Sequence, residues 1–469
     1  MQQRPWYRSV GFWLSLVVTS VGVVGASVYA NLSYDVTDAE DYAYFPPFKA
    51  GYDGNSNDHL GAEYFNIAEA LVDGRGYADP FGTPTGPTAW MPPVLTLFEA
   101  GLLLHFDRDK VAVANVVIVC QVFSLWLTAV LVLAAGRKTA PAVPSLLVVP
   151  LVALALITRF HTAYQVTHDS WMVLLAFDGV LAFALWGRPS ASGLRSLAWG
   201  VGGGVATLIS PVLALCWCLL TVCEAVRVRR GRPLLVACVA CALVVTPWVV
   251  RNAVVFGRFI PVKSNLAYEL YQAQLLSADG RLSDKVFATH PYATHGVERS
   301  ECAALGEMAF LDRKRAAFDE AVRGNPSHFA EKVYDRLLAA TVDYSPMNEA
   351  EMERETLSLL CAVTHPLPVL AGFGLLLLAP FRRLSGACWA GLALLAVYLA
   401  PYIVVSYYER YEFPLWGLKI LVIVWCLDAV FTLVGRGFRR IFRGRREAVP
   451  AAATYSESAS PRPPAQVIR

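Results

Sequence analysis

Uncharged apolar runs recur along most of the chain, and short polar segments separate them. Each run is about 20 residues long, which is enough for a helix to cross the hydrocarbon core of a bilayer. We predict ten such spans, at residues 10–30, 110–135, 139–158, 170–187, 194–210, 211–227, 233–250, 355–379, 384–405 and 412–434. The pattern therefore predicts an all-α integral membrane protein with about ten transmembrane helices.

Two of these spans share one uncharged stretch, residues 196–223. One helix would be long enough to cross there, but Ser210 and Pro211 in the middle of the stretch favour a turn. A turn at this point also keeps the basic loops on one side of the membrane. We therefore predict two helices that meet at this serine and proline.

Residues 92–106 are apolar, but two prolines open this segment, and His105 and Asp107 close it. If the segment does not cross, every basic loop lies on the same side as both termini. These loops contain Arg137 with Lys138, Arg188 with Arg195, the cluster from Arg227 to Arg232, Arg382 with Arg383, and the tail from Arg436 to Arg446. Basic loops favour the cytoplasmic side. We therefore predict an outer juxtamembrane helix at 92–106 and cytoplasmic N- and C-termini.

This topology leaves two large outer regions, 31–109 and 251–353. The first region, up to residue 91, holds ten acidic residues and two basic ones, a net charge of −8. The second region is polar, and its periodicity predicts helices near 301–323 and 327–340. We expect the second region to form a small helical cap over the outer face.

The composition agrees with a membrane protein, since 56% of the residues are hydrophobic and only 16% are charged. A soluble domain needs more charge on its surface, so that class is excluded. Most of the ten cysteines lie in apolar runs, including Cys238 and Cys241, so no disulfide framework or zinc knuckle is predicted. Arg4 and Arg8 precede the first span and indicate an uncleaved signal anchor. The tail 436–469 is basic and then rich in Pro, Ala and Ser, which is typical of disorder.

Ionisable and polar residues recur at the span ends that this topology puts on the outer face. The candidates are Asp58, Glu63, Tyr64, His168, Asp169, Arg251, Asn252, Lys263 and Arg410. Carboxylates and cations at a lipid–water boundary suit a reaction with an anionic lipid leaving group. A carboxylate takes a proton from an acceptor hydroxyl, and Arg or Lys stabilises the departing phosphate.

Four short motifs follow one another in a recognisable order. They are the stretch Glu63–Tyr77 with its Gly-Arg-Gly-Tyr end and the later Pro92-Pro93, the pair His168-Asp169, the run Pro247-Trp248-(two residues)-Arg251-Asn252 continuing as Phe-Gly-Arg-Phe-Ile-Pro, and Arg410-Tyr411-(two residues)-Pro414. Over residues 1–435 the chain resembles the GT-C membrane glycosyltransferases, in particular the protein O-mannosyltransferases and lipid A aminoarabinose transferases. The resemblance implies one GT-C-like transmembrane domain that uses a polyprenyl-phosphate-linked sugar and inverts the transferred sugar.

The resemblance also implies that an acid of the first outer loop is the catalytic base. In the family this acid lies three or four residues before the tyrosine that matches Tyr64, where this chain has Leu60 and Gly61. Asp58 and Glu63 are therefore both candidates, in that order, and Asp169 follows as an orienting or acceptor-binding group. Substrate-binding roles go to Arg251, Asn252, Lys263, Arg410, Tyr64 and His168.

The expected partners are the lipid-linked sugar donor, a lipid, glycan or protein acceptor, and membrane lipids, with no nucleic acid. No His, Asp or Glu cluster has metal spacing, so no cofactor is indicated, and a divalent cation is kept as an alternative. Three ionisable residues fall inside spans: Asp178, Lys419 and Asp428. We expect structural partners for Asp178 and Asp428, and a core hydrogen bond for His365. We expect Lys419 to extend to the headgroups, and contact with the outer site or the donor phosphate is the alternative.

Simpler interpretations compete with these roles. Asp169 could cap the following helix, and Arg251, Arg410 and Lys263 could extend to the headgroups without a substrate. A transporter or lipid flippase would place its polar groups near the midplane and in repeated halves, which the sequence does not show. A non-catalytic scaffold for envelope assembly would tolerate loss of Asp58.

Overall fold

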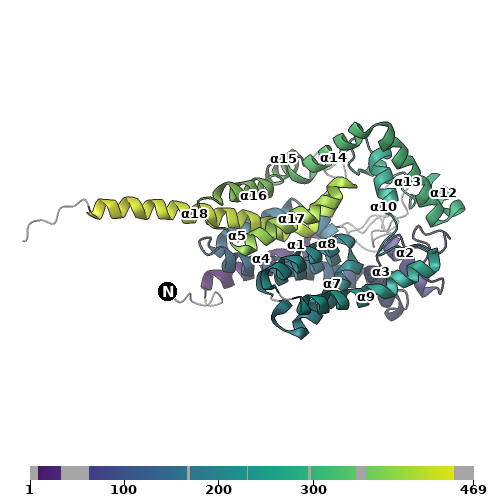
Figure 1. The fold of residues 1–469 in the computed structure, drawn as a ribbon, viewed down its shortest axis with the longest axis horizontal. Coiled ribbons are helices and arrows are strands. Elements are labelled where there is room, and N and C mark those ends of the chain that lie inside the picture. The colour runs from purple at the N-terminus through teal and green to yellow at the C-terminus, as the bar shows by residue number, and fades with distance from the viewer. Residues whose placement is uncertain are drawn as a thin grey trace, which may run out of the picture.

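The computed structural model describes residues 9–32, 63–165, 169–187, 189–229, 231–293, 297–344 and 355–447. Long helices lie side by side in a bundle, and one of them, α18 (Trp416–Glu447), projects from one end (Figure 1). Shorter helices, including α10 (Leu266–Tyr271), α12 (Val297–Leu305) and α13 (Glu307–Gly324), gather at the opposite end. Asp58 and His168 lie outside the described residues.

Seven helical stretches within these ranges are long and apolar enough to cross a membrane. They are α1 (Val10–Leu32), α4 (Lys110–Thr139), α8 (Pro211–Val228), α9 (Arg232–Phe256), the pair α15 (Glu355–Thr364) and α16 (Leu367–Leu378), α17 (Gly386–Val404), and α18 with the 3-10 turn η8 (Glu409–Leu415) before it. Apolar but shorter helices are α3 (Pro93–His105), α5 (Val148–Ile157) and α6 (Ser170–Trp186). The predicted all-α membrane fold is confirmed, while the count of ten spans stays a prediction.

Prolines set several helix boundaries. Helix α7 (Gly193–Ile209) ends where α8 begins, so the predicted break at Ser210 and Pro211 is confirmed. Helical structure after α4 resumes only at η3 (Ser145–Leu147), directly after Pro144, and the predicted span 139–158 is correspondingly shorter. Pro366 lies in the break between α15 and α16, where the sequence predicted one continuous helix. Each break fits the missing N–H of proline.

The cap end contains the helices that the sequence predicted there. Helix α2 (Glu63–Val72) lies where the first outer loop predicted a short helix, and Gly74 and Gly76 follow it with φ values of 77° and 81°. α13 and α14 (Pro326–Thr341) correspond to the predicted cap helices near 301–323 and 327–340. The π-helical turn η6 (Gln272–Leu276) and the short α11 (Asp284–Phe287) complete this end.

The main hydrophobic core lies between α4, α6, α17 and α18. Trp425, Tyr398, Phe177 and Leu418 are almost fully buried there. α7 packs closely on α9, because Gly200 has no side chain at the contact. A Cβ at this position would collide with the Ala237 backbone. These contacts hold the ends of helices that are far apart in sequence at fixed positions around the candidate site.

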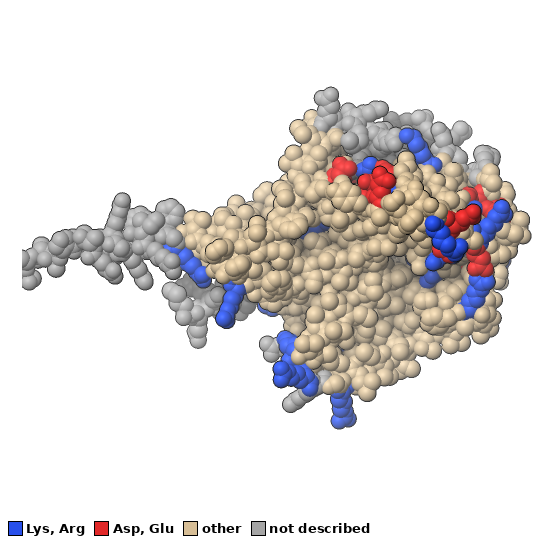
Figure 2. All heavy atoms as spheres, turned by 45° about the horizontal axis from the view of Figure 1, so that its top comes forward, with Lys and Arg blue, Asp and Glu red and all other residues tan. Residues whose placement is uncertain are grey.

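Charged side chains are separated along the bundle. In the view of Figure 2 an uncharged band separates an end with basic side chains from an end that carries both acids and bases. Inside the spans, Asp428 pairs with Arg382 at 2.6 Å, and Asp178 bonds to the Thr128 hydroxyl. His365 Nε2 lies 2.8 Å from Ala339 O. The predicted structural partners for these buried groups are therefore confirmed.

Candidate active site

A cavity of about 170 Å³ lies where α2, α6, α8, α10, α17 and η8 meet. Its polar lining consists of Tyr64, Asp169, Ser170, Ser210, Lys263, Glu269, Tyr398, Tyr402, Ser406, Arg410 and Tyr411. Four of these residues, Tyr64, Asp169, Lys263 and Arg410, were candidates from the sequence. The fold brings them together from segments that are up to several hundred residues apart.

Asp169 supplies a carboxylate to this cavity. It occupies the N-cap position of α6, but its side chain makes no capping hydrogen bond. The Tyr64 hydroxyl instead donates to Asp169 Oδ2 over 3.2 Å. Burial, followed by the nearby Asp169 charge, raises the pKa of Tyr64 well above its usual range, so Tyr64 stays a neutral donor. The Asp169 carboxylate therefore faces Tyr64 and the cavity, and its role in the site stays a prediction.

Arg410 supplies a cation from η8. Its guanidinium lies over the Tyr408 ring, 5.0 Å from the ring centroid. Within the described ranges it has no hydrogen-bond acceptor or ion-pair partner, and its Nε atom is buried. A guanidinium that lines a cavity with free donors is well suited to receive an anionic oxygen.

Lys263 is a second cation in the cavity wall, and it too has no polar partner among the residues that the structure describes. Its neighbours are held on both sides. Trp248 Nε1 donates to Val262 O over 2.7 Å, and Ser264 Oγ donates to Glu307 Oε1 over 2.6 Å. The backbone around Lys263 is therefore fixed, while its ammonium group remains available.

Glu307 is the buried carboxylate that fixes this region. It accepts hydrogen bonds from Thr88 Oγ1, from the Ala89 backbone N–H over 3.0 Å, and from Ser264. Burial raises the pKa of Glu307, while its hydrogen-bond donors oppose that shift. Through these bonds α13 ties the first outer loop to the segment that carries Lys263.

Glu269 lines the cavity and was not singled out from the sequence. It lies on α10, and its Oε2 accepts from Ser406 Oγ and Gln272 Nε2, both over 2.8 Å. Nothing in the local pattern distinguishes it from the many other acids of the cap. The one signal in the sequence is that Glu269 follows Lys263 by six residues. This short separation could have suggested that both residues belong to one site.

Glu63 lies beside the cavity rather than in its lining. It is 9% exposed, and burial raises its pKa to about 7, with the Arg410 charge opposing the shift and Glu269 and Asp169 adding to it. Its Oε1 atom lies 3.9 Å from His290 Nε2. Burial lowers the pKa of His290 to about 3, so that imidazole is neutral and offers no counter-charge.

Arg251 and Asn252 lie away from the cavity lining. Arg251 donates to Thr88 O over 2.6 Å and to Tyr77 O over 2.9 Å, and it packs on the Tyr77 and Trp248 rings. Asn252 Nδ2 donates to Ile260 O over 3.0 Å. Their substrate-binding roles stay predictions, and the observed contacts give both residues a part in fixing the outer loops.

Two comparisons return nothing: no protein-family model and no curated protein matches the sequence. Among solved structures, the chain is similar to the apo form of the Archaeoglobus fulgidus oligosaccharyltransferase, with a TM-score of 0.48 and 13% identity over 96% of this chain and 53% of that chain. It is also similar to ArnT from Cupriavidus metallidurans bound to undecaprenyl phosphate, with a TM-score of 0.35 and 15% identity over 90% of this chain and 79% of that chain.

Both proteins are members of the GT-C superfamily, which the sequence motifs also resemble. The chain spans about half the length of the Archaeoglobus protein. At these identities and TM-scores, the structural similarity assigns neither a reaction nor a substrate to this chain. Any conclusion about function therefore rests on the residues that line the cavity.

Proposed function

We propose that this chain is a membrane glycosyltransferase that moves a sugar from a polyprenyl-phosphate donor to an acceptor hydroxyl. The observation that carries the proposal is the cavity with two cations, Arg410 and Lys263, that have no protein partner among the described residues. A carboxylate, Asp169, faces the same space. Glu269 is a second carboxylate of the lining. Two cations and these two carboxylates suit an anionic leaving group and a hydroxyl that must lose a proton.

In the proposed reaction the acceptor oxygen attacks the anomeric carbon of the sugar. The bond between that carbon and the phosphate oxygen breaks, and the phosphate leaves on the polyprenol with the bonding electron pair. Arg410 and Lys263 stabilise the charge that develops on the phosphate. The acceptor proton passes to a carboxylate, and the attack inverts the anomeric centre.

We assign the base to Asp169, because it lines the cavity and Tyr64 holds it in place. Glu63 is not part of the lining, so it ranks below Asp169, although a pKa raised to about 7 suits a general base at neutral pH. Asp58 lies outside the described residues and remains the alternative that the sequence favours. Glu269 accepts from Ser406 in the wall and is suited to bind sugar or acceptor hydroxyls.

The proposal also places the protein in the cell membrane, with the cavity on the external face and both termini in the cytoplasm. Support comes from the charge pattern, since basic loops favour the cytoplasmic side. The acceptor is a lipid, glycan or protein hydroxyl.

The test is transfer of labelled sugar from polyprenyl phosphate by the purified full-length protein in detergent. Asp169→Asn keeps the size of the side chain but removes its basicity, so we expect turnover to fall by at least about 10²-fold. Asp58→Asn is measured beside it. Loss of transfer in Asp58→Asn alone would move the base to Asp58, and unchanged transfer in Asp58, Glu63 and Asp169 variants would refute the glycosyltransferase proposal.

A further inference from the structure

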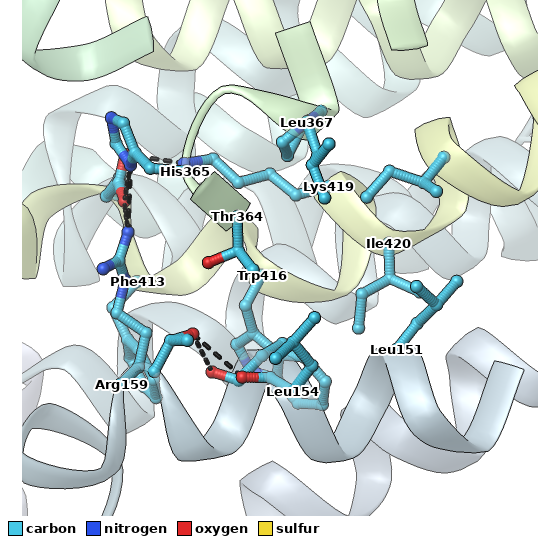
Figure 3. A pocket seen from close by; sticks show the side chains of 15 residues that line it. Leu151, Leu154, Arg159, Thr364, His365, Leu367, Phe413, Trp416, Lys419 and Ile420 are labelled. Atoms are coloured by element: carbon cyan, nitrogen blue, oxygen red, sulfur yellow. Dashed lines mark hydrogen bonds and ion pairs between the residues drawn. The ribbon is translucent and has the colours of Figure 1, made fainter. Parts of the chain in front are cut away.

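A second cavity, of about 80 Å³, lies on the other side of η8. Arg410, Tyr411 and Pro414 of this turn line the candidate active site, whereas Glu412 and Phe413 line the second cavity. Its walls come from α5, from the junction of α15 and α16, and from α18 (Figure 3). One short segment thus separates two cavities, and none of the roles assigned above uses the second one.

The second cavity is polar at one end and apolar at the other. From α5 and the residue that follows it, the lining residues are Leu151, Leu154, Ala155 and Thr158. On α18 they are Trp416, Lys419, Ile420 and Ile423. Both sets recur at intervals of three or four residues, so each set forms one stripe along its helix. Thr158 and Lys419 mark the polar end, next to η8, and Leu151 and Ile423 mark the apolar end. This gradient along two helices matches a lipid headgroup followed by its chain.

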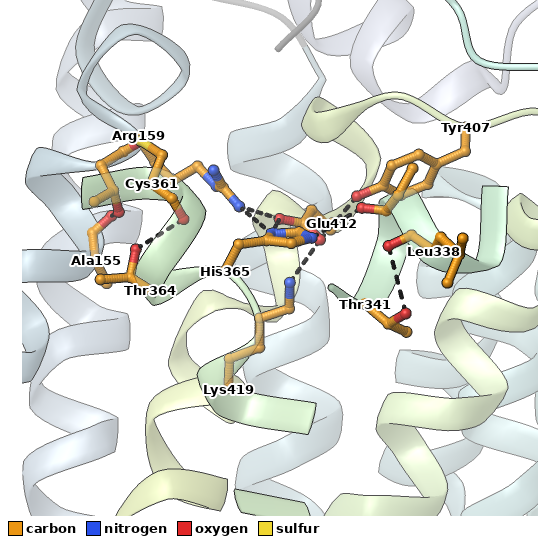
Figure 4. A network of polar contacts seen from close by, with 12 residues as sticks. Ala155, Arg159, Leu338, Thr341, Cys361, Thr364, His365, Tyr407, Glu412 and Lys419 are labelled. Carbon is orange, nitrogen blue, oxygen red and sulfur yellow. Dashed lines mark hydrogen bonds and ion pairs between the residues drawn. The ribbon is translucent and has the colours of Figure 1, made fainter. Parts of the chain in front are cut away.

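The polar end holds a cluster in which two cations share one carboxylate (Figure 4). Lys419 Nζ lies 2.6 Å from Glu412 Oε2, and Arg159 pairs with Glu412 Oε1. The Tyr407 hydroxyl donates to Glu412 over 2.9 Å, and Arg159 Nη2 lies 3.2 Å from His365 Nδ1. The side chain of Glu412 is only 1% exposed. Its carboxylate oxygens are therefore occupied by these protein partners and do not face a ligand.

The two cations, Arg159 and Lys419, have more N–H donors than these contacts occupy. Arg159 has five N–H donors and directs one nitrogen at Glu412 and His365, while Lys419 directs one of three donors at Glu412. Their side chains are 12% and 13% exposed, and both line the cavity. Glu409 also contributes to the field at Arg159, but it is not part of the lining. Arg159 also lies over the Tyr344 ring, 5.2 Å from its centroid. Donors of Arg159 and Lys419 beyond those that contact Glu412 and His365 therefore border the cavity above the apolar stripe.

We propose that this second cavity binds an anionic phospholipid of the bilayer. The phosphate would accept hydrogen bonds from Arg159 and Lys419, and one acyl chain would lie along the stripe between α5 and α18. The bilayer is the source we assign, because Leu367 at the cavity wall is 36% exposed on the apolar surface of the bundle. The bound lipid would contact the side of η8 that carries Glu412 and Phe413, opposite to the side that carries Arg410. The inference does not depend on the proposed transfer reaction.

The test uses the full-length protein in nanodiscs with equal amounts of phosphatidylglycerol and phosphatidylcholine, followed by native mass spectrometry of the retained lipid. We expect the wild type to retain phosphatidylglycerol. Ala155→Trp fills the cavity and should abolish retention, whereas Ala153→Trp, at an exposed position of the same helix, should not. Lys419→Met should reduce the preference for phosphatidylglycerol by about tenfold, and Lys419→Arg should preserve it.

Equal retention by Ala155→Trp and Ala153→Trp would overturn the proposal, even if Lys419→Met failed to fold. Addition of undecaprenyl phosphate tests whether the cavity prefers a polyprenyl phosphate to a phospholipid. If one equivalent displaces the retained phospholipid completely, the cavity belongs to the polyprenyl carrier and the phospholipid assignment is wrong. A wild-type protein that is inactive in sugar transfer but retains phosphatidylglycerol would refute the proposed function and leave this inference standing.

Discussion

The Tyr64 hydroxyl lies 3.2 Å from Asp169 Oδ2, although 105 residues separate the two in sequence. Tyr64 is the second residue of the short helix α2 in the first outer loop, and Asp169 precedes α6. The contact joins two elements, and neither the hydropathy pattern nor the helical period of the sequence predicts that they meet. It also turns the carboxylate of a helix N-cap toward a cavity instead of toward its own backbone.

Replacement of Tyr64 by Phe should leave the fold intact and slow transfer. The variant loses one hydrogen bond to a carboxylate, so we expect turnover to fall by about tenfold. The measurement is kcat with saturating lipid donor. Tyr334→Phe on the exposed face of α14 serves as the control and should behave as wild type. Wild-type kcat in Tyr64→Phe would show that Asp169 does not depend on this contact.

Arg410→Ala should reduce turnover by about 10²-fold or more, because a charge-assisted contact with the departing phosphate is lost. Arg410→Lys should restore only part of the rate, since an ammonium cannot present the planar fork of a guanidinium. Arg323→Ala, at an exposed position of α13, is the control. The role assigned to Arg410 would be refuted by normal transfer in the alanine variant.

Glu63 should make the thermal stability of the protein depend on pH. Burial raises its folded pKa to about 7, whereas the unfolded carboxyl keeps its usual value near 4.5. Between these values only the folded state holds the proton, so the stabilisation is complete below about pH 4.5 and is lost as pH rises towards 7. Glu63→Gln should flatten this part of the Tm profile, and Glu320→Gln on exposed α13 should not. Parallel profiles for wild type and Glu63→Gln would contradict the raised pKa.

Glu307→Ala should destabilise the cap end by about 1–3 kcal/mol, because buried donors on Thr88, Ala89 and Ser264 lose their acceptor. We expect a lower Tm and a higher KM for the lipid donor, since the segment that carries Lys263 is no longer fixed. Glu320→Ala on the same helix is the matched control. A lower Tm with an unchanged KM would limit Glu307 to a structural role.

The proposed orientation can be tested by labelling single cysteines in a chain whose ten native cysteines are replaced. A cysteine at Arg323 in the cap should react with an impermeant maleimide added to intact cells. A cysteine at Arg195, near the start of α7 at the end predicted to be cytoplasmic, should react only after the cells are opened. The reverse pattern would invert the topology derived from the basic loops.

The sequence by itself determined the helical membrane architecture and much of its segmentation. Long apolar runs admit helices because a bilayer leaves no other partner for the backbone N–H and C=O groups. The division at Ser210 and Pro211 and the two cap helices α13 and α14 also follow from local signals. Such signals act over one or two turns, so they can be read along the chain.

Only the tertiary structure decided which polar groups meet. It placed Glu269 beside Asp169 and Arg410, used the donors of Arg251 on backbone carbonyls, and paired Lys419 with Glu412. These outcomes depend on how helices pack across large separations in sequence, and no local period encodes them. A span end rich in polar residues therefore predicts that a site exists, while helix packing decides which of those residues form it.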